Sequence, residues 1–277
     1  MLGLISRGRP ALRVKSSSDD HAMRLFVVVI AAYLVVALAL PLYAMLSKSM
    51  LDPDGLFIGL ANYVAYFRTP ALVYSIKNSL FVGVLTTLIT VTIAFLLAYA
   101  LTRSRMPAKP AFKTIAMIPI LVPSLLPGIA LIYLFGRQGL INGMLFGHDI
   151  YGPIGIIIAE VFFTLPHALI IITTALSIAD ARLYEAAISL RASRTRIFFT
   201  VTIPGVRYGL ISAAFVVFTL AVTDFGAPKV IGGDFNVLAT DIYKQVIGQQ
   251  NFSMGAVVSV VLLIPAGLAF LVDRIVQ

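Results

Sequence analysis

Residues 25–46 read LFVVVIAAYLVVALALPLYAML, an apolar run that contains no charged residue. A helix needs about 20 mostly apolar residues to cross the hydrocarbon core of a bilayer. The run is longer than the apolar region of a secretory signal peptide, and no small-residue cleavage site stands out after it. We therefore interpret it as a retained helix that crosses a membrane.

Further runs of the same kind follow along the chain: Ser79–Leu101, about Ile115–Phe135, about Ile154–Ile178, about Tyr208–Phe225 and Met254–Val272. They are apolar on all faces, which favours helices over the alternating strands of a membrane barrel. Only 12% of the 277 residues are charged and 60% are hydrophobic, whereas soluble domains carry roughly 25% charged residues. The sequence predicts an all-α polytopic membrane protein with about six transmembrane helices.

Positive charges are distributed unevenly between the connections of these spans. If the N-terminus is cytoplasmic, the opposite side holds only Lys48, Arg68, Lys77, Arg137, Lys229 and Lys244, and the other fifteen of the 21 lie inside. Cytoplasmic loops carry an excess of Lys and Arg, so we expect both termini in the cytoplasm. The net charge of +9 is then a topology signal rather than a nucleic-acid-binding surface. Residues 1–23 are expected to form a basic cytoplasmic tail, and residues 24–277 the membrane domain.

Residue types that support many chemistries are absent or scattered. The chain has no cysteine, and its histidines (His21, His148 and His167) are far apart, so we expect no thiol catalysis and no metal site. It also lacks the GxxxxGK[ST] loop that cradles nucleotide phosphates. We expect no catalytic residue and no cofactor bound by this chain.

The connection at about residues 180–204 is too patterned to be a simple linker. Apolar residues recur at helical spacing in two stripes, Leu183, Ala186, Ala187 and Leu190 and then Ile197, Phe198 and Val201. Pro204 is expected to end this segment before the fifth span. The pattern predicts two short amphipathic helices at the cytoplasmic face, which lie in the lipid interface or dock in a partner's groove.

This loop resembles the EAA loop of ABC importer permeases. The residues expected to form the coupling loop are Glu185, Ala186, Ala187, Ser189, Leu190, Arg191, Ala192, Ser193 and Pro204. The resemblance implies a type I importer permease, whose coupling helices seat in a cleft of a separate ATPase subunit that binds ATP. Arg191 departs from the family, which usually has Gly there. Because Gly tolerates positive φ, Arg191 must either accept strain or belong to a different turn.

The resemblance also implies partners and a location. They are ABC ATPase subunits, a periplasmic solute-binding protein, a second permease copy or homologous half, and the lipid of a bacterial inner membrane.

The stretches Thr223–Gly233 and Val237–Phe252 resemble the ferric iron, thiamine and phosphonate branch, and most closely 2-aminoethylphosphonate permeases. We expect that solute, with ferric iron, thiamine or another small solute as alternatives. A transporter driven by an ion gradient would leave the loop unexplained, and a membrane-embedded enzyme would need a polar cluster that is not evident.

Polar residues inside the spans are candidates for a translocation path, because a charge at the bilayer centre is costly. They are Glu160, His167 and Asp224. Other interpretations stay open: Glu160 protonated or paired within the bundle, His167 bonded to a carbonyl freed by Pro166, and Asp224 capping an interface. Prolines at every fourth position in the third span, Pro119, Pro123 and Pro127, predict a kink, which marks either a path or merely irregular packing.

Overall fold

The computed structural model describes residues 18–145 and 147–276, which are helical apart from turns and one isolated bridge between Leu51 and Phe57. The chain divides into two units, residues 1–45 and 46–277. Helix α1 (Ser18–Ser49) supplies the described part of the first unit. Its side chains from Asp19 to Tyr43 are exposed, as suits a helix surrounded by lipid. The expected tail lies outside the described residues up to residue 17, but its last residues belong to α1.

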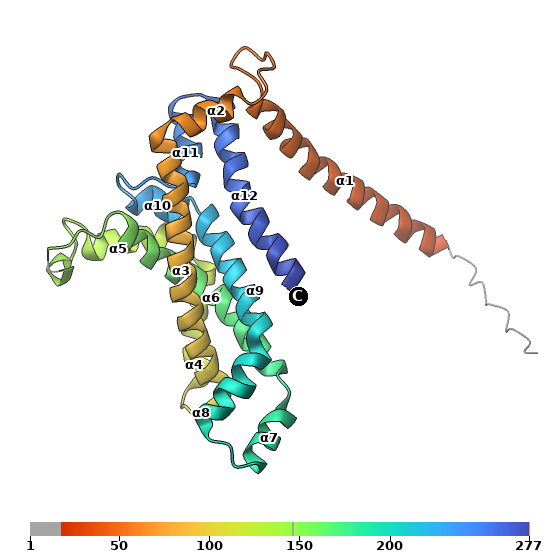
Figure 1. Cartoon of the computed structure of the whole chain (residues 1–277), viewed down its shortest axis with the longest axis vertical. Helices are drawn as coiled ribbons and strands as arrows, with labels where there is room; N and C mark the ends of the chain where they lie inside the picture. Colours follow the sequence, from red (N-terminus) through yellow and green to blue (C-terminus); the bar gives the residue numbers. More distant parts are fainter. Residues whose placement is uncertain (1–17, 146, 277) are drawn as a thin grey trace, which may run out of the picture. The chain divides into compact units, whose positions relative to one another are not determined.

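Three long helices form the centre of the second unit: α3 (Pro70–Arg103), α6 (Pro153–Ile178) and α9 (Ile203–Thr223) (Figure 1). Helix α12 (Phe252–Val276) packs against α9. Many buried contacts between these helices involve small residues, including Ala94, Ala98, Ala168 and Ala213. Small side chains let helix backbones approach closely, which is how helices associate when lipid removes most of the hydrophobic driving force.

Helices α3 and α6 run parallel and in register. The hydroxyls of Thr90 and Thr164 lie 3.1 Å apart. Three turns further along, Nη2 of Arg103 donates to the carbonyl of Leu176 at 2.9 Å. These two links therefore fix which residues of α3 and α6 lie at the same level.

The third predicted span is broken. Helix α4 (Lys109–Met117) continues as the 3-10 turn η1 (Ile118–Leu121), and α5 (Leu125–Phe135) then leaves at an angle of 105°. Pro119 and Pro123 lie before the bend, where each removes a backbone donor. The described residues hold five helices long and apolar enough to cross a membrane, or six if this bent pair counts as one span. The prediction of about six spans in an all-α protein is confirmed.

Short helices cover one end of the bundle: α2 (Ala61–Arg68), α11 (Leu238–Tyr243) and the π-helical turn η4 (Lys244–Gly248). Helix α10 (Gly226–Ile231) packs against α5 and α6, and η2 (Asn142–Leu145) follows α5. The amide of Asn78 donates to the carbonyl of Asn236, and Oγ of Ser79 accepts from the amide of Leu238, both at 2.8 Å. These bonds fix the α11 segment to the start of α3. We call this end of the bundle the α11 end.

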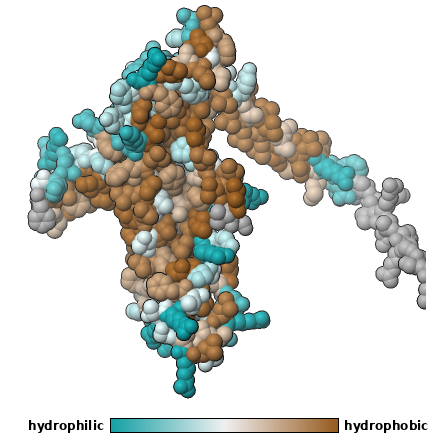
Figure 2. All heavy atoms as spheres, viewed as in Figure 1, coloured by the Kyte–Doolittle hydropathy of each residue, from teal (hydrophilic) through white to brown (hydrophobic). Residues whose placement is uncertain are grey.

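At the opposite end, which we call the α7 end, α7 (Ala181–Ser189) is followed by α8 (Arg194–Ile197) and the π-helical turn η3 (Phe198–Thr202). Figure 2 shows hydrophobic residues along the middle of the second unit and hydrophilic ones gathered mainly toward its ends. This distribution suits a bundle whose middle lies in lipid and whose ends reach water.

Candidate functional site: the α7 loop and a buried acidic cluster

Helix α7 occupies the place where the sequence predicts the first coupling helix. The carboxylate of Asp180 accepts from the amide of Arg182 at 2.9 Å and so caps its N-terminus. Large apolar side chains remain exposed on it and at its C-cap: Leu183 and Ile188 at 55% and 65%, and the C-cap Leu190 at 83%. An amphipathic helix that leaves such residues uncovered is suited to docking in a groove.

The turn after α7 is built with Arg191 in the left-handed region, at a φ of 54°. The amide of Arg191 donates to the carbonyl of Ile188 at 2.9 Å, and the amide of Ala192 donates to that of Ala187 at 3.0 Å. This pair of bonds defines a Schellman C-cap, in which the residue at the position of Arg191 is usually Gly. The structure therefore resolves the departure noted in the sequence: the turn is kept, and Arg191 adopts the unfavourable φ.

The second coupling helix is not a separate element, so the prediction that Pro204 ends the segment is wrong. Oγ of Ser193 accepts from the amide of Arg196 at 3.2 Å and caps a helix that continues to Thr223. The reason lies in η3, where the amide of Ile203 donates to the carbonyl of Phe198, five residues back. This wider turn precedes Pro204 in the first turn of α9, where a missing amide donor is tolerated.

The loop is tied to the bundle through Tyr184. Its hydroxyl donates to Oγ1 of Thr202 at 3.1 Å, and the guanidinium of Arg103 lies 4.2 Å from the centre of its ring. Because Arg103 also binds the carbonyl of Leu176, these contacts link α7 to α3, α6 and the start of α9. Sequence reasoning missed this role: Arg103 counted only as a topology charge, and nothing in the spacing pairs it with Tyr184.

A second anchor lies on η3. The ring of Phe198 lies edge-on to the rings of Phe95 and Tyr99, with centroids 5.9 Å and 5.6 Å apart. Edge-to-face pairs of this kind contribute about 0.5–1.5 kcal/mol each beyond burial. The second apolar stripe of the sequence thus packs partly inside the protein rather than on a partner.

The predicted loop residues divide by exposure. Ala187 and Ala192 are half-buried, whereas those available to a partner are Glu185, Ala186, Ser189, Leu190, Arg191, Ser193 and Pro204. Within the described part of the chain, Glu185 forms no hydrogen bond or ion pair. An unpaired charge on an exposed helix is available for a partner.

Of the three predicted path residues, the structure brings two together. Glu160 on α6 is fully buried, and neither carboxylate oxygen has a hydrogen-bond partner in the described structure. Asp224, directly after α9, interacts electrostatically with it. Oδ2 of Asp224 also accepts from the amide of Ala227 at 2.9 Å.

His167 lies apart from this pair, two helical turns along α6. Its ring is 5.7 Å from that of Phe163, and its Nδ1 is buried without a hydrogen-bond partner. Pro166 does not interrupt α6, and Nδ1 makes no bond to a freed carbonyl. Within the described residues, no group of three or more His, Asp or Glu side chains could hold a metal ion.

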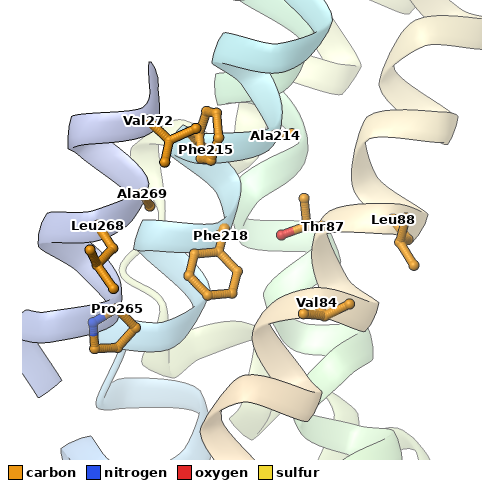
Figure 3. Close-up of a pocket in the computed structure, with 10 residues that line it drawn as sticks. All are labelled: Val84, Thr87, Leu88, Ala214, Phe215, Phe218, Pro265, Leu268, Ala269 and Val272. Atoms are coloured by element: carbon orange, nitrogen blue, oxygen red, sulfur yellow. The ribbon is translucent and has the colours of Figure 1, made fainter. Parts of the chain in front are cut away.

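An apolar groove between α3, α9 and α12 does not suit a polar solute. It has a volume of about 440 Å³ and is lined by residues of all three helices (Figure 3). Its one hydroxyl, that of Thr87, donates to the carbonyl of Gly83 on its own helix at 2.6 Å. The pair formed by buried Glu160 and partly exposed Asp224 is the better candidate for binding a charged group.

Comparison with known proteins places these features in a family. Residues 90–277 match the family described as binding-protein-dependent transport system inner membrane component. The chain is 33% identical over 216 residues to the ferric transport system permease protein FbpB of Actinobacillus pleuropneumoniae, covering 73% of this chain but only 31% of that protein. It is 28% identical over 221 residues to the molybdenum transport system permease protein ModB of Mycobacterium tuberculosis, covering 76% and 81%.

A solved structure supports the fold. A bacterial ABC transporter involved in the import of the acidic polysaccharide alginate contains a chain that matches with a TM-score of 0.73 at 16% identity, over 94% of this chain and 97% of that one. The family match over residues 90–277 includes α7, and the solved structure has the same fold. The chain belongs to the family of binding-protein-dependent transport system inner membrane components.

Proposed function

We propose that this chain is a permease subunit of an ATP-driven importer and forms, with a second permease copy or a homologous half, the solute path across a bacterial inner membrane. The observation that carries the proposal is the α7 loop: a capped amphipathic helix with exposed apolar residues and an unpaired Glu185, tied to α3, α6 and α9 through Arg103 and Tyr184. In this proposal, the contacts of Tyr184 with Arg103 and Thr202 transmit the movement of a docked subunit to the bundle.

ATP hydrolysis comes from separate ATPase subunits in this proposal, because the sequence has no phosphate-binding loop. ATP binding closes the ATPase pair, α7 moves with its docking cleft, and the link to Thr202 and Arg103 shifts the long helices. A periplasmic binding protein delivers the solute at the α11 end. Both partners are inferred from the family and from the shape of the loop.

For the solute, we propose 2-aminoethylphosphonate, on the resemblance of Val237–Phe252 to permeases for that compound. Ferric iron is the second candidate, because a relative that is 33% identical is named a ferric permease. An oxyanion is the third, since another relative is named for molybdenum.

The test is a pull-down of the tagged chain from its native membrane after mild cross-linking, with partners identified by mass spectrometry. Wild-type chain should capture an ATPase subunit, and Glu185→Lys should lower that capture at least tenfold at equal chain yield. Asp54→Lys, a matched change on an exposed carboxylate at the α11 end, should leave it unchanged. Absence of an ATPase from the wild-type sample would contradict the proposed function, and undiminished capture by Glu185→Lys would contradict docking through α7.

A further inference from the structure

Glu160 is an unusual residue for the interior of a helical bundle. Its side chain is completely buried, and both carboxylate oxygens lack a hydrogen-bond partner. In the described residues no lysine or arginine forms an ion pair with it. Burying a carboxyl group that has no cationic partner, beside the carboxyl group of Asp224, is costly, so an arrangement of this kind indicates a group kept for a ligand rather than for stability.

Thr86 provides a second, independent observation. The register fixed by Thr90 with Thr164 and by Arg103 with Leu176 places Thr86 on α3 at the level of Glu160 on α6, one turn before the threonine pair. Thr86 is fully buried and its Oγ1 has no hydrogen-bond partner. A hydroxyl and a carboxyl group thus lie at one level of the bundle, and neither has a partner other than the carboxyl group of Asp224 beside Glu160.

Breaks in two helices meet at the same place. Helix α9 ends at Thr223, and its last turn packs through Val222 against Gly83, less than one turn from Thr86 on α3. The α10 segment then begins at Gly226, whose Cα faces Ser124 and Leu125 at the bend of the third span. Broken helices at the level of a charged group are the arrangement in which transporters bind solutes.

We propose that Glu160, Asp224 and Thr86 bind a protonated amine of the transported solute, an inference that rests on the proposed function. Two carboxyl groups supply acceptors for the three donors of an ammonium group, and Thr86 adds a neutral oxygen. An ammonium group is favoured over a bare metal ion, because no described group of three His, Asp or Glu side chains exists here. Glu160 and Thr86 are fully buried in this conformation and Asp224 is only partly exposed, so the solute reaches all three when the bundle opens.

Uptake by proteoliposomes that contain the complete transporter tests this assignment. The chain is reconstituted with its co-purified ATPase, and ATP-driven uptake is measured with the co-purified binding protein outside. The probes are labelled 2-aminoethylphosphonate and spermidine, ethylphosphonate as the analogue without an amine, molybdate, and ferric citrate. Wild-type chain should transport a probe with an amine at least tenfold faster than ethylphosphonate, molybdate or ferric citrate.

Point variants test the role of the proposed binding residues in uptake. Glu160→Gln keeps the shape of the side chain and should lower uptake of the amine at least tenfold. Thr86→Val should lower uptake by about threefold. Asp273→Asn is the matched control, because Asp273 accepts from Oγ of Ser212 on the neighbouring helix, at 2.9 Å and away from the cluster; it should transport as wild type does.

Each outcome decides between the two proposals. Unchanged amine uptake by folded Glu160→Gln, or equal uptake of ethylphosphonate, molybdate or ferric citrate by wild type, would overturn the assignment and leave the importer function standing. If wild-type chain supports no ATP-driven uptake of any probe and captures no ATPase, the importer function is wrong and the assignment falls with it. Chain yield and melting temperature identify a variant that fails to fold, and Thr86→Val then serves as the deciding variant.

Discussion

Arg191 holds a left-handed backbone conformation at a φ of 54°, which costs a residue with a Cβ about 1–2 kcal/mol. Gly would remove that strain but lose about 0.5–1 kcal/mol more conformational entropy on folding. We therefore expect Arg191→Gly to stabilise the turn by about 0.5–1 kcal/mol. Hydrogen exchange at the amides of Arg191 and Ala192 should slow by roughly two- to fivefold. Arg191→Ala keeps the Cβ and should exchange as wild type does; an equal slowing in it would show that φ strain is not the cause.

Asp241 gives the α11 end a dependence on pH. Burial raises the pKa of its carboxyl group above the ordinary value of 3.8, against the opposing effects of Ser75 and Lys244. Between 3.8 and the raised pKa, the folded chain holds a proton that the unfolded chain has released, so stability falls as pH rises through that window and then levels off.

Asp241→Asn should remove this fall and raise the melting temperature of the detergent-solubilised chain at neutral pH. Thermal unfolding between pH 4 and pH 8 measures the melting temperature of wild type and variant as a function of pH. Asp234→Asn, on an exposed carboxyl group near the same end, should keep the wild-type profile. A profile for Asp241→Asn that still falls with pH would assign the effect to another group.

Tyr66, whose pKa burial raises to about 12, stays neutral throughout and keeps its 3.1 Å bond to the carbonyl of Leu72.

At the scale of elements, the sequence located the spans because apolar length alone marks them. It could not give the 105° bend within the third span. Prolines predict a break, but the helices packed against the span set the angle of that break. It misjudged Pro204, because the π-helical turn that accommodates the ring depends on packing of Phe198 against α3. It found Glu160 and Asp224 separately, but only the helix register identifies Thr86.

The contact between α6 and α9 depends on a glycine. A Cβ at Gly209 would overlap the Cβ of Ala175, whereas one at Gly205, one turn earlier on the same helix, would lie 3.9 Å from the nearest atom, the Cβ of Ala179. We expect Gly209→Ala to destabilise the chain by about 1–3 kcal/mol, since the helices must move apart. Gly205→Ala should be neutral or stabilising by up to about 1 kcal/mol through helix propensity. Melting of the two variants in detergent measures the difference, and equal melting temperatures would mean that α9 shifts freely on α6.

At the scale of the whole second unit, the structure gathers at the α7 end most of the positive charges assigned to the cytoplasm. Helices α3, α4, α7 and α8 all end or begin there (Figure 1). The residues concerned are Arg103, Arg105, Lys109, Lys113, Arg182, Arg191, Arg194, Arg196 and Arg207. Lys and Arg near the ends of spans remain on the cytoplasmic side, so we expect the α7 end to face the cytoplasm.

Because the chain has no cysteine, single cysteines report this orientation in an otherwise unchanged protein. Ser189→Cys on exposed α7 should react with a membrane-impermeant maleimide only after the membrane is opened, whereas Asp54→Cys at the α11 end should react on spheroplasts. Denatured samples labelled in parallel control for the reactivity of each thiol. Labelling of Ser189→Cys on sealed spheroplasts would place α7 outside the membrane, where no ATPase has ATP to hydrolyse. The contacts of Tyr184 with Arg103 and Thr202 would then have to link the bundle to a different partner.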